Sequence, residues 1–225
     1  MTAIAVDRLE KNFSYSCVLR DVSLSVEAGQ CYVLFGANGA GKTTLLRILA
    51  TIQRPSGGRF VINGFNGVQE RDEVRHSLFL VTHGSHLYDE LSGRENLRFA
   101  LGLRGLEWDG AEGERVLDRV GLTAFAAMKT RHYSSGMKKR LAFAKAMLIR
   151  PPVLLLDEPY AALDENAMEM INGFVAEFTG AGGTVLMVSH NRHRSARVAH
   201  RAGILRRGGI DEVTLDHLAG ADELL

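Results

Sequence analysis

The stretch GANGAGKTT, residues 36–44, stands between a run of apolar residues and a segment with helical spacing. It matches the pattern Gly-x-x-x-x-Gly-Lys-Ser/Thr, in which glycines let successive backbone amides point inward at a polyphosphate. The run from Cys31 to Phe35 predicts a buried strand, and apolar positions after Lys42 predict a helix to about Thr51. Together they predict a phosphate-binding loop within an α/β fold. The loop consists of Gly36, Ala37, Asn38, Gly39, Ala40, Gly41, Lys42, Thr43 and Thr44.

The residue types in this loop suit a bound nucleotide. The start of the following helix favours anions, Lys42 can reach the β- and γ-phosphates, and Thr43 can hold Mg²⁺. The alternative is a glycine-rich turn that binds nothing, and the order strand, loop, helix disfavours it.

Two carboxylates follow the apolar run from Val153 to Leu156, which predicts a central parallel strand covered on both faces. Asp157 and Glu158 therefore lie at the carboxyl end of that strand, where open α/β sheets bind ligands. Asp157 suits the surroundings of Mg²⁺, and Glu158 can accept a proton from an attacking water. The alternative is a pair of acidic residues that closes a strand at the surface.

Strands and helices alternate along the chain, which predicts a mainly parallel sheet. A capping box formed by Ser92 and Glu95 begins one helix, and Asp164 can cap another. Strands are expected as a hairpin-like pair over 21–35, over 59–62, at about 78–82 and over 184–188. Helices are expected from 92 to about 103, over about 111–120, over 135–149 and from 164 to about 179.

Five motifs in a fixed order resemble those of the nucleotide-binding subunit of ABC transporters, and the resemblance extends from Phe13 to about Gly209. The motifs are GANGAGKTT (36–44), YSSGM (133–137), LLLDEP (154–159), AALD (161–164) and VSH (188–190). The resemblance implies a P-loop NTPase fold of the ABC ATPase type, with a mainly parallel α/β core and an antiparallel β subdomain. It places core and β subdomain at 1–83 and 153–225, and an inserted helical subdomain at 84–152.

The resemblance also implies how a second subunit completes the site. The signature consists of Ser134, Ser135, Gly136 and Met137. Ser134 and Gly136 open a helix that in relatives grips the γ-phosphate of ATP held by the opposite subunit, and helix N-terminal amides do favour anions. Asp164 matches a carboxylate at the subunit interface.

Two further positions take their roles from the resemblance. His190 matches the switch histidine that contacts the γ-phosphate, and Phe13 aligns with the aromatic residue that stacks on adenine, with Tyr15 as the weaker candidate. Stacking distinguishes poorly between bases, so ATP as the ligand is inferred from the family.

The chain departs from the most familiar signature, LSGGQ, at two positions. Ser135 replaces a glycine, which limits positive φ, and Met137 cannot make the hydrogen bonds of a glutamine amide. A third departure is His83, where most relatives carry a glutamine. Imidazole is a poorer Mg²⁺ ligand than an amide oxygen, so we expect His83 to bind water or phosphate and to relay the nucleotide state to a partner. The alternative is a loop histidine without consequence.

His83 and the segment after it, LYDELSGRENLRF, look like the haem-exporter ATPases of cytochrome c maturation and neighbouring ABC-2-type exporters. This resemblance implies a magnesium-dependent ATPase that forms a homodimer or pseudo-symmetric dimer around two ATP molecules. It would drive export through separate transmembrane permease subunits, from the cytoplasmic face of the cell membrane. The alternatives are a soluble ABC ATPase acting on ribosomes or nucleic acid, and a regulatory module that binds ATP without turnover.

The composition fits this assignment. The chain has 225 residues, 46% of them apolar, and a net charge of 27 − 26 = +1, so it exerts no overall attraction on nucleic acid. No apolar run approaches the ~18 residues of a membrane-spanning helix, which predicts a soluble protein. Cys17 and Cys31 are expected to be buried, reduced thiols.

Residues 178–210 contain no acidic residue but six arginines. The arginines are Arg192, Arg194, Arg197, Arg201, Arg206 and Arg207. A solvated helix face is one interpretation, and contact with a membrane subunit or anionic headgroups is the other. Nucleic acid is not expected, because no aromatic residues are interleaved.

Overall fold

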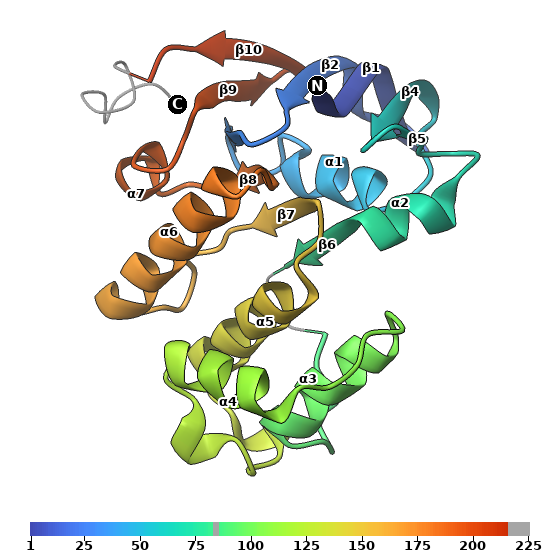
Figure 1. Cartoon of the computed structure of the whole chain (residues 1–225). Coiled ribbons are helices and arrows are strands. Elements are labelled where there is room, and N and C mark those ends of the chain that lie inside the picture. Colours follow the sequence, from blue (N-terminus) through green and yellow to red (C-terminus); the bar gives the residue numbers. More distant parts are fainter. Residues whose placement is uncertain (83–85, 216–225) are drawn as a thin grey trace.

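The six-stranded sheet that carries the glycine-rich loop runs in the order β10-β9-β3-β8-β7-β6. The structure is a computed structural model that describes residues 1–82 and 86–215 (Figure 1). All neighbours in this sheet pair in parallel except β9 and β10. Its strands are β3 (Cys31–Phe35), β6 (Leu78–Val81), β7 (Val153–Asp157), β8 (Thr184–Val188), β9 (Arg201–Arg206) and β10 (Gly209–Val213).

The central strands β3, β7 and β8 are buried throughout and mainly apolar because both faces of this sheet are covered. In β7, Leu154 and Leu156 belong to one hydrophobic cluster, whereas Val153 and Leu155 belong to another. The first cluster includes residues of α5 (Ser135–Ile149) and α6 (Glu165–Gly180). The second includes α1 (Lys42–Leu49) and a second sheet. The prediction of a central strand buried on both faces is confirmed.

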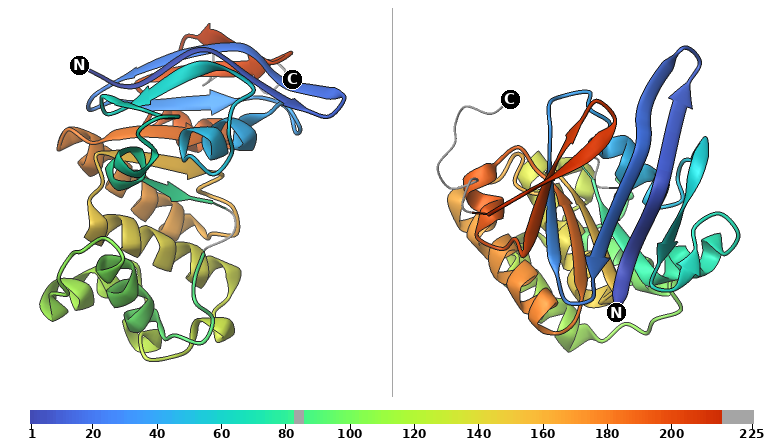
Figure 2. Two further views of the ribbon diagram at one scale, coloured as in Figure 1. Left: turned by 90° about the vertical axis from the view of Figure 1, so that its right-hand side faces the viewer. Right: turned by 90° about the horizontal axis from the view of Figure 1, so that it is seen from above.

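The second sheet is antiparallel, has the order β2-β1-β4-β5 and lies across the top of the first (Figure 2). Its strands are β1 (Thr2–Phe13), β2 (Ser16–Glu27), β4 (Gly57–Ile62) and β5 (Phe65–Asn66). The hairpin-like pair predicted over residues 21–35 is wrong, because β2 pairs with β1 and β3 lies in the other sheet. Burial explains the split: β2 alternates buried and exposed residues, whereas β3 is buried throughout.

The helical segment of the chain lies at the end of the molecule away from the antiparallel sheet (Figure 2). It contains α3 (Gly93–Gly102), α4 (Gly110–Arg119), α5 and the short helices η1 (Thr123–Phe125) and η2 (Thr130–His132). The predicted capping box is confirmed, since Ser92 Oγ accepts from the Glu95 amide and the Glu95 carboxylate accepts from the Ser92 amide. Asp164 caps α6 as predicted, by accepting from the Ala167 amide at 2.8 Å.

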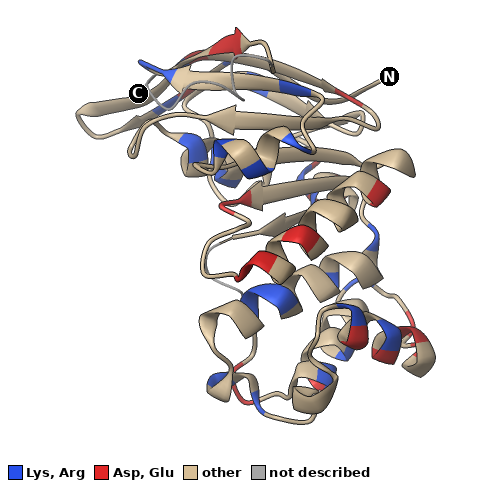
Figure 3. Cartoon of the chain, turned by 90° about the vertical axis from the view of Figure 1, so that its left-hand side faces the viewer, with Lys and Arg blue, Asp and Glu red and all other residues tan. Residues whose placement is uncertain are grey.

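Two small helices complete the described chain, α2 (Arg71–Ser77) and α7 (Arg192–Ala196). Two of the six arginines singled out in the sequence, one in α7 and one directly after it, form ion pairs with α6. Arg194 forms ion pairs with Glu165 and Glu169 of α6, and Arg197 also pairs with Glu169. Both signs of charge are therefore interspersed on this face of the molecule (Figure 3).

The two cysteines differ in their surroundings. Cys31 is buried in β3, and its burial raises the pKa of the thiol to about 12. Cys17 is exposed in β2, so the expectation that both are buried is wrong for this residue. Among the described residues, no helix is long and apolar enough to cross a bilayer.

Candidate active site

The glycine-rich loop connects β3 to α1, as the sequence predicted. Two of its glycines are required by their geometry. Gly41 has a φ of 103°, and a Cβ there would lie 2.8 Å from Leu19 Cδ2. Gly36 has a φ of 151°, and a Cβ would lie 2.7 Å from the carbonyl oxygen of Leu205. A side chain at either position would force the loop to open.

Lys42 is folded over this loop. Its Nζ donates to the carbonyl oxygens of Gly36 at 2.6 Å and Ala37 at 2.9 Å. Burial lowers the pKa of Lys42, although the carboxylates of Glu158 and Asp157 act in the opposite direction. The ammonium group is therefore held at the loop, where a phosphate oxygen can replace a carbonyl oxygen as its acceptor.

Thr43 and Asp157 meet although they are far apart in sequence. The Thr43 Oγ1 donates to Asp157 Oδ1 at 3.2 Å, which joins the first turn of α1 to the end of β7. A hydroxyl and a carboxylate oxygen are ligands that Mg²⁺ accepts, usually together with phosphate oxygens and waters. The donor set thus fits the metal that the sequence led us to expect.

Glu158 and His190 form the next part of the site. Glu158 has a φ of 49°, in the left-handed region, and its amide donates to Val188 at 2.9 Å. Its Oε2 accepts from the His190 amide at 3.2 Å. Its Oε1 is buried without a hydrogen-bond partner in the described part of the chain, and lies 3.4 Å from His190 Nε2. An unpaired carboxylate oxygen is able to accept a proton.

These residues line one cavity of about 380 Å³. The chain supplies the lining from four places: the glycine-rich loop, the end of β7, the end of β8 and one residue of β2. The lining residues are Val18, Asn38, Gly39, Gly41, Lys42, Thr43, Thr44, Asp157, Glu158, Val188 and His190.

Phe13 is not among the residues that line this cavity. It ends β1 with 42% of its surface exposed, and Lys11 Nζ lies 4.8 Å from the centre of its ring. Val18 lines the cavity instead, and no local signal in the sequence distinguished it from the other apolar residues of β2.

The signature segment lies at the start of α5. Ser134 is the N-cap and accepts from the Met137 amide at 3.2 Å. Ser135 lies in the first turn of α5 without a positive φ, so the conformational freedom of glycine is not needed at this position. A Cβ on Gly136 would lie 2.9 Å from the carbonyl oxygen of Ala162, so the signature touches the loop that leads to Asp164.

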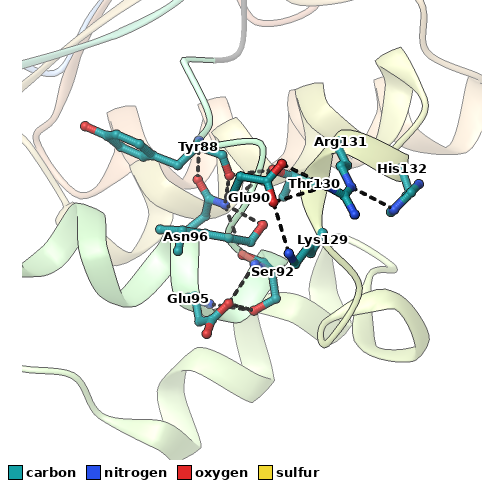
Figure 4. A network of polar contacts seen from close by, with 10 residues as sticks. Tyr88, Glu90, Ser92, Glu95, Asn96, Lys129, Thr130, Arg131 and His132 are labelled. Atoms are coloured by element: carbon teal, nitrogen blue, oxygen red, sulfur yellow. Dashed lines mark hydrogen bonds and ion pairs between the residues drawn. The ribbon is translucent and has the colours of Figure 1, made fainter.

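The loop that follows residue 85 is held against residues 129–131, which come just before the signature (Figure 4). Asn96 is fully buried, accepts from the Tyr88 amide at 2.9 Å and donates to the Leu91 carbonyl oxygen at 3.2 Å. Glu90 forms ion pairs with Lys129 and Arg131. His83, proposed from the sequence as a relay, lies outside the described residues.

Two buried lysines of α5 were not anticipated. Lys139 Nζ donates to the carbonyl oxygens of Thr82 at 3.2 Å and Asp157 at 3.4 Å, and Lys145 Nζ donates to that of His86 at 3.0 Å. Burial lowers the pKa of each lysine to about 8. For Lys145 the sequence offered a signal, a lysine inside the apolar run LAFAKAM (141–147), whereas Lys139 stands in the basic run KKR (138–140), which gives no sign of burial.

Comparison with known proteins identifies this arrangement. The family model described as ABC transporter matches residues 19–161. The daunorubicin resistance ATP-binding protein DrrA3 of Streptomyces coeruleorubidus is 35% identical over 220 residues, which cover 96% of this chain and 70% of that protein. The ABC transporter ATP-binding protein NatA of Bacillus subtilis (strain 168) is 30% identical over 204 residues, 87% of this chain and 83% of that protein.

Another relative is the spermidine/putrescine import ATP-binding protein PotA of Chromobacterium violaceum, which is 34% identical. The match covers 95% of this chain but only 60% of PotA.

Solved structures agree with the family. One described as the ATP-binding subunit of an ABC transporter has a TM-score of 0.88 and 29% identity, and the match covers 97% of this chain and 95% of that one. A dimeric ATP-binding cassette bound to ADP and Pi has a TM-score of 0.83 and 24% identity, with coverage of 94% and 98%, and supports the fold. The predicted fold class is thereby confirmed. The chain belongs to the ABC transporter family, as one of its ATP-binding, ATP-hydrolysing domains.

Proposed function

We propose that two copies of this chain, or this chain and a close relative, pair head to tail and hydrolyse ATP at their shared interface. One observation carries the proposal. The cavity that contains Lys42 and Glu158 has no lining residue from the signature segment 134–137, while the N-cap of α5, Ser134, is exposed. An exposed helix N-terminus favours an anion, and a second chain can present its own at this cavity.

The residues of the cavity divide the work of phosphoryl transfer to water. The amides of the loop and the start of α1 bind the phosphates, and Lys42 exchanges its carbonyl partners for phosphate oxygens. Glu158 accepts a proton from the attacking water through its unpaired Oε1. The Nε2 of His190 lies 3.4 Å from both Lys42 Nζ and Glu158 Oε1, and His190 contacts the terminal phosphate. Thr43 and Asp157 would hold Mg²⁺, which when bound neutralises charge on the phosphates.

The Glu158→Gln variant tests this assignment. The amide cannot accept the proton, so turnover should fall by about 100-fold or more, while ATP binding persists. Trapped ATP should then hold two chains together, which light scattering after size exclusion will report as an ATP-dependent dimer. A variant that stays monomeric at saturating ATP contradicts the paired site.

We also propose that a separate membrane subunit docks beside the helical segment, with the chain at the cytoplasmic face of a membrane. Between β6 and α3 lies a groove of about 270 Å³, which is lined by Phe79, Tyr88, Phe99 and Leu103, among others. Tyr88 and Phe99 form an edge-to-face pair with ring centres 4.5 Å apart and are both exposed. A groove with exposed aromatic residues suits a short amphipathic helix of a partner.

Export is the proposed direction of transport, and haem for cytochrome c assembly is the proposed cargo. The support is the resemblance of His83 and residues 87–99 to haem exporters, together with a relative named for daunorubicin resistance. The test is to co-purify the membrane subunits and measure ATP-dependent accumulation of haem in inside-out vesicles. Accumulation in right-side-out vesicles instead would contradict export.

A further inference from the structure

The peptide unit between Asp157 and Glu158 is held from both sides. Its carbonyl oxygen, that of Asp157, accepts from Lys139 Nζ at 3.4 Å, and its amide, that of Glu158, donates to Val188 at 2.9 Å. Glu158 itself has a φ of 49°, a conformation that costs a non-glycine residue about 1 kcal/mol or more. Such a conformation persists only where neighbouring groups hold it, and these two hydrogen bonds act on the peptide that precedes it.

Lys139 is an unusual residue to find in this place. It lies in the second turn of α5 and is 4% exposed, so its ammonium group is removed from most of its water. The group also donates to the Thr82 carbonyl oxygen at 3.2 Å, and thus joins the ends of the paired strands β6 and β7. A buried cation needs compensating partners, and here these are two backbone oxygens together with the nearby carboxylates of Asp157 and Glu158.

The orientation of this peptide decides where the Glu158 carboxylate points. The carboxylate is placed against His190, with Oε2 accepting from the His190 amide at 3.2 Å. Rotation of the peptide would swing the side chain away from that position, and a displacement of about 1 Å of a reacting group can lower a rate by about 100-fold.

We propose that Lys139 is a positioning residue for ATP hydrolysis, which holds the Asp157–Glu158 peptide so that Glu158 faces the attacking water. Because Lys139 belongs to the helix that begins at Ser134, it also links the signature end of one chain to the alignment of Glu158 in that same chain. Contact of the signature with one ATP is thereby transmitted to the second site of the pair. Both parts of the inference rest on the proposed function: the first on Glu158 as the proton acceptor, and the second on the pairing of two chains.

Lys145 provides a matched control. It lies on the same helix, is 6% exposed and donates to the His86 carbonyl oxygen, whereas among the described residues only Lys139 of the two lysines hydrogen-bonds to the Asp157–Glu158 peptide. Replacing either lysine by methionine removes a buried charge and keeps an unbranched side chain of similar length. The two variants therefore share any general effect on folding, and thermal unfolding will confirm that both are folded.

The first experiment compares Lys139→Met, Lys139→Arg and Lys145→Met in the full chain. We expect Lys139→Met to lower kcat by about 10- to 100-fold with KM for ATP nearly unchanged. Lys139→Arg keeps a charged donor and should recover part of the rate, whereas Lys145→Met should change kcat less than about twofold. Equal losses in the two methionine variants would overturn the proposal.

A double-variant cycle then locates the effect. If Lys139 acts through Glu158, adding Lys139→Met to Glu158→Gln should lower the residual rate no further. A further loss by the same factor as in the wild-type background would show that Lys139 acts elsewhere.

Hydrogen exchange gives a reading that does not depend on turnover. The Glu158 amide should exchange at least about tenfold faster in Lys139→Met than in Lys145→Met, because its hydrogen bond to Val188 is no longer supported from the other side of the peptide. Unchanged exchange would refute the positioning role. Absence of ATPase activity in the wild-type chain would refute the proposed function instead, and the exchange result would still decide the role of Lys139.

Discussion

Single residues in this protein are placed by contacts that join distant parts of the chain. Thr43 meets Asp157, and Lys42 lies 3.4 Å from His190, although each pair is separated by more than one hundred residues. The residues themselves could be predicted, because the phosphate loop and the carboxylate pair are each a continuous stretch of sequence. Phe13 and Val18 could not be ranked in this way, because only the strand pairing decides which of them reaches the cavity.

The burial of Lys145 predicts that the stability of the folded chain depends on pH. Burial lowers its pKa from 10.5 to about 8, so between these values the folded chain binds fewer protons than the unfolded chain. The contribution of this residue to the free energy of unfolding should therefore rise with pH, by an amount on the order of 1–2 kcal/mol from pH 7.5 to 9.5. Urea denaturation of the wild type and of Lys145→Met at these two pH values isolates the contribution of Lys145. The same change with pH in both proteins would contradict the prediction.

At the scale of elements, the sequence predicted what local patterns determine. The capping box at Ser92, the cap at Asp164 and the extent of α5 all depend on neighbouring residues, and all agree with the structure. The pairing of β2 with β1 does not depend on neighbours alone. Two strands close in sequence can join different sheets when one is buried on a single face and the other on both, and a hairpin pattern does not distinguish these cases.

Two glycines in helices make a matched test of the contact between α5 and the loop before α6. Alanine at Gly173, in α6, meets no atom within 4 Å and should raise the free energy of unfolding by about 0.5–1 kcal/mol through helix propensity. Alanine at Gly136 would place its Cβ 2.9 Å from a backbone oxygen of Ala162, so the same gain should be absent or reversed. Urea unfolding of both variants measures the difference, and an equal gain at Gly136 would mean that this contact is not tight.

At the scale of the whole molecule, the proposed pair divides each site between two chains. Homodimers of Lys42→Ala and of Ser134→Arg should both be inactive. The first substitution disables the phosphate loop of every site, and the second disables the signature of every site. A mixed dimer has one intact site, so mixing the two proteins should give turnover above that of either alone. Mixing Lys42→Ala with Glu158→Gln is the control, because each chain then spoils its own cavity and no activity should return. Recovery in the control, or none in the first mixture, would show that the sites are not shared.

The strand β7 ends at the two carboxylates, and its four apolar residues are divided between both hydrophobic clusters. No side of this strand is free to yield when a neighbour changes size. Substitutions at apolar positions in either cluster, even remote ones, will therefore shift Asp157 and Glu158 and change the rate of the reaction. Compensating substitutions in relatives are thus to be sought across the thickness of the sheet, well away from any atom that touches nucleotide.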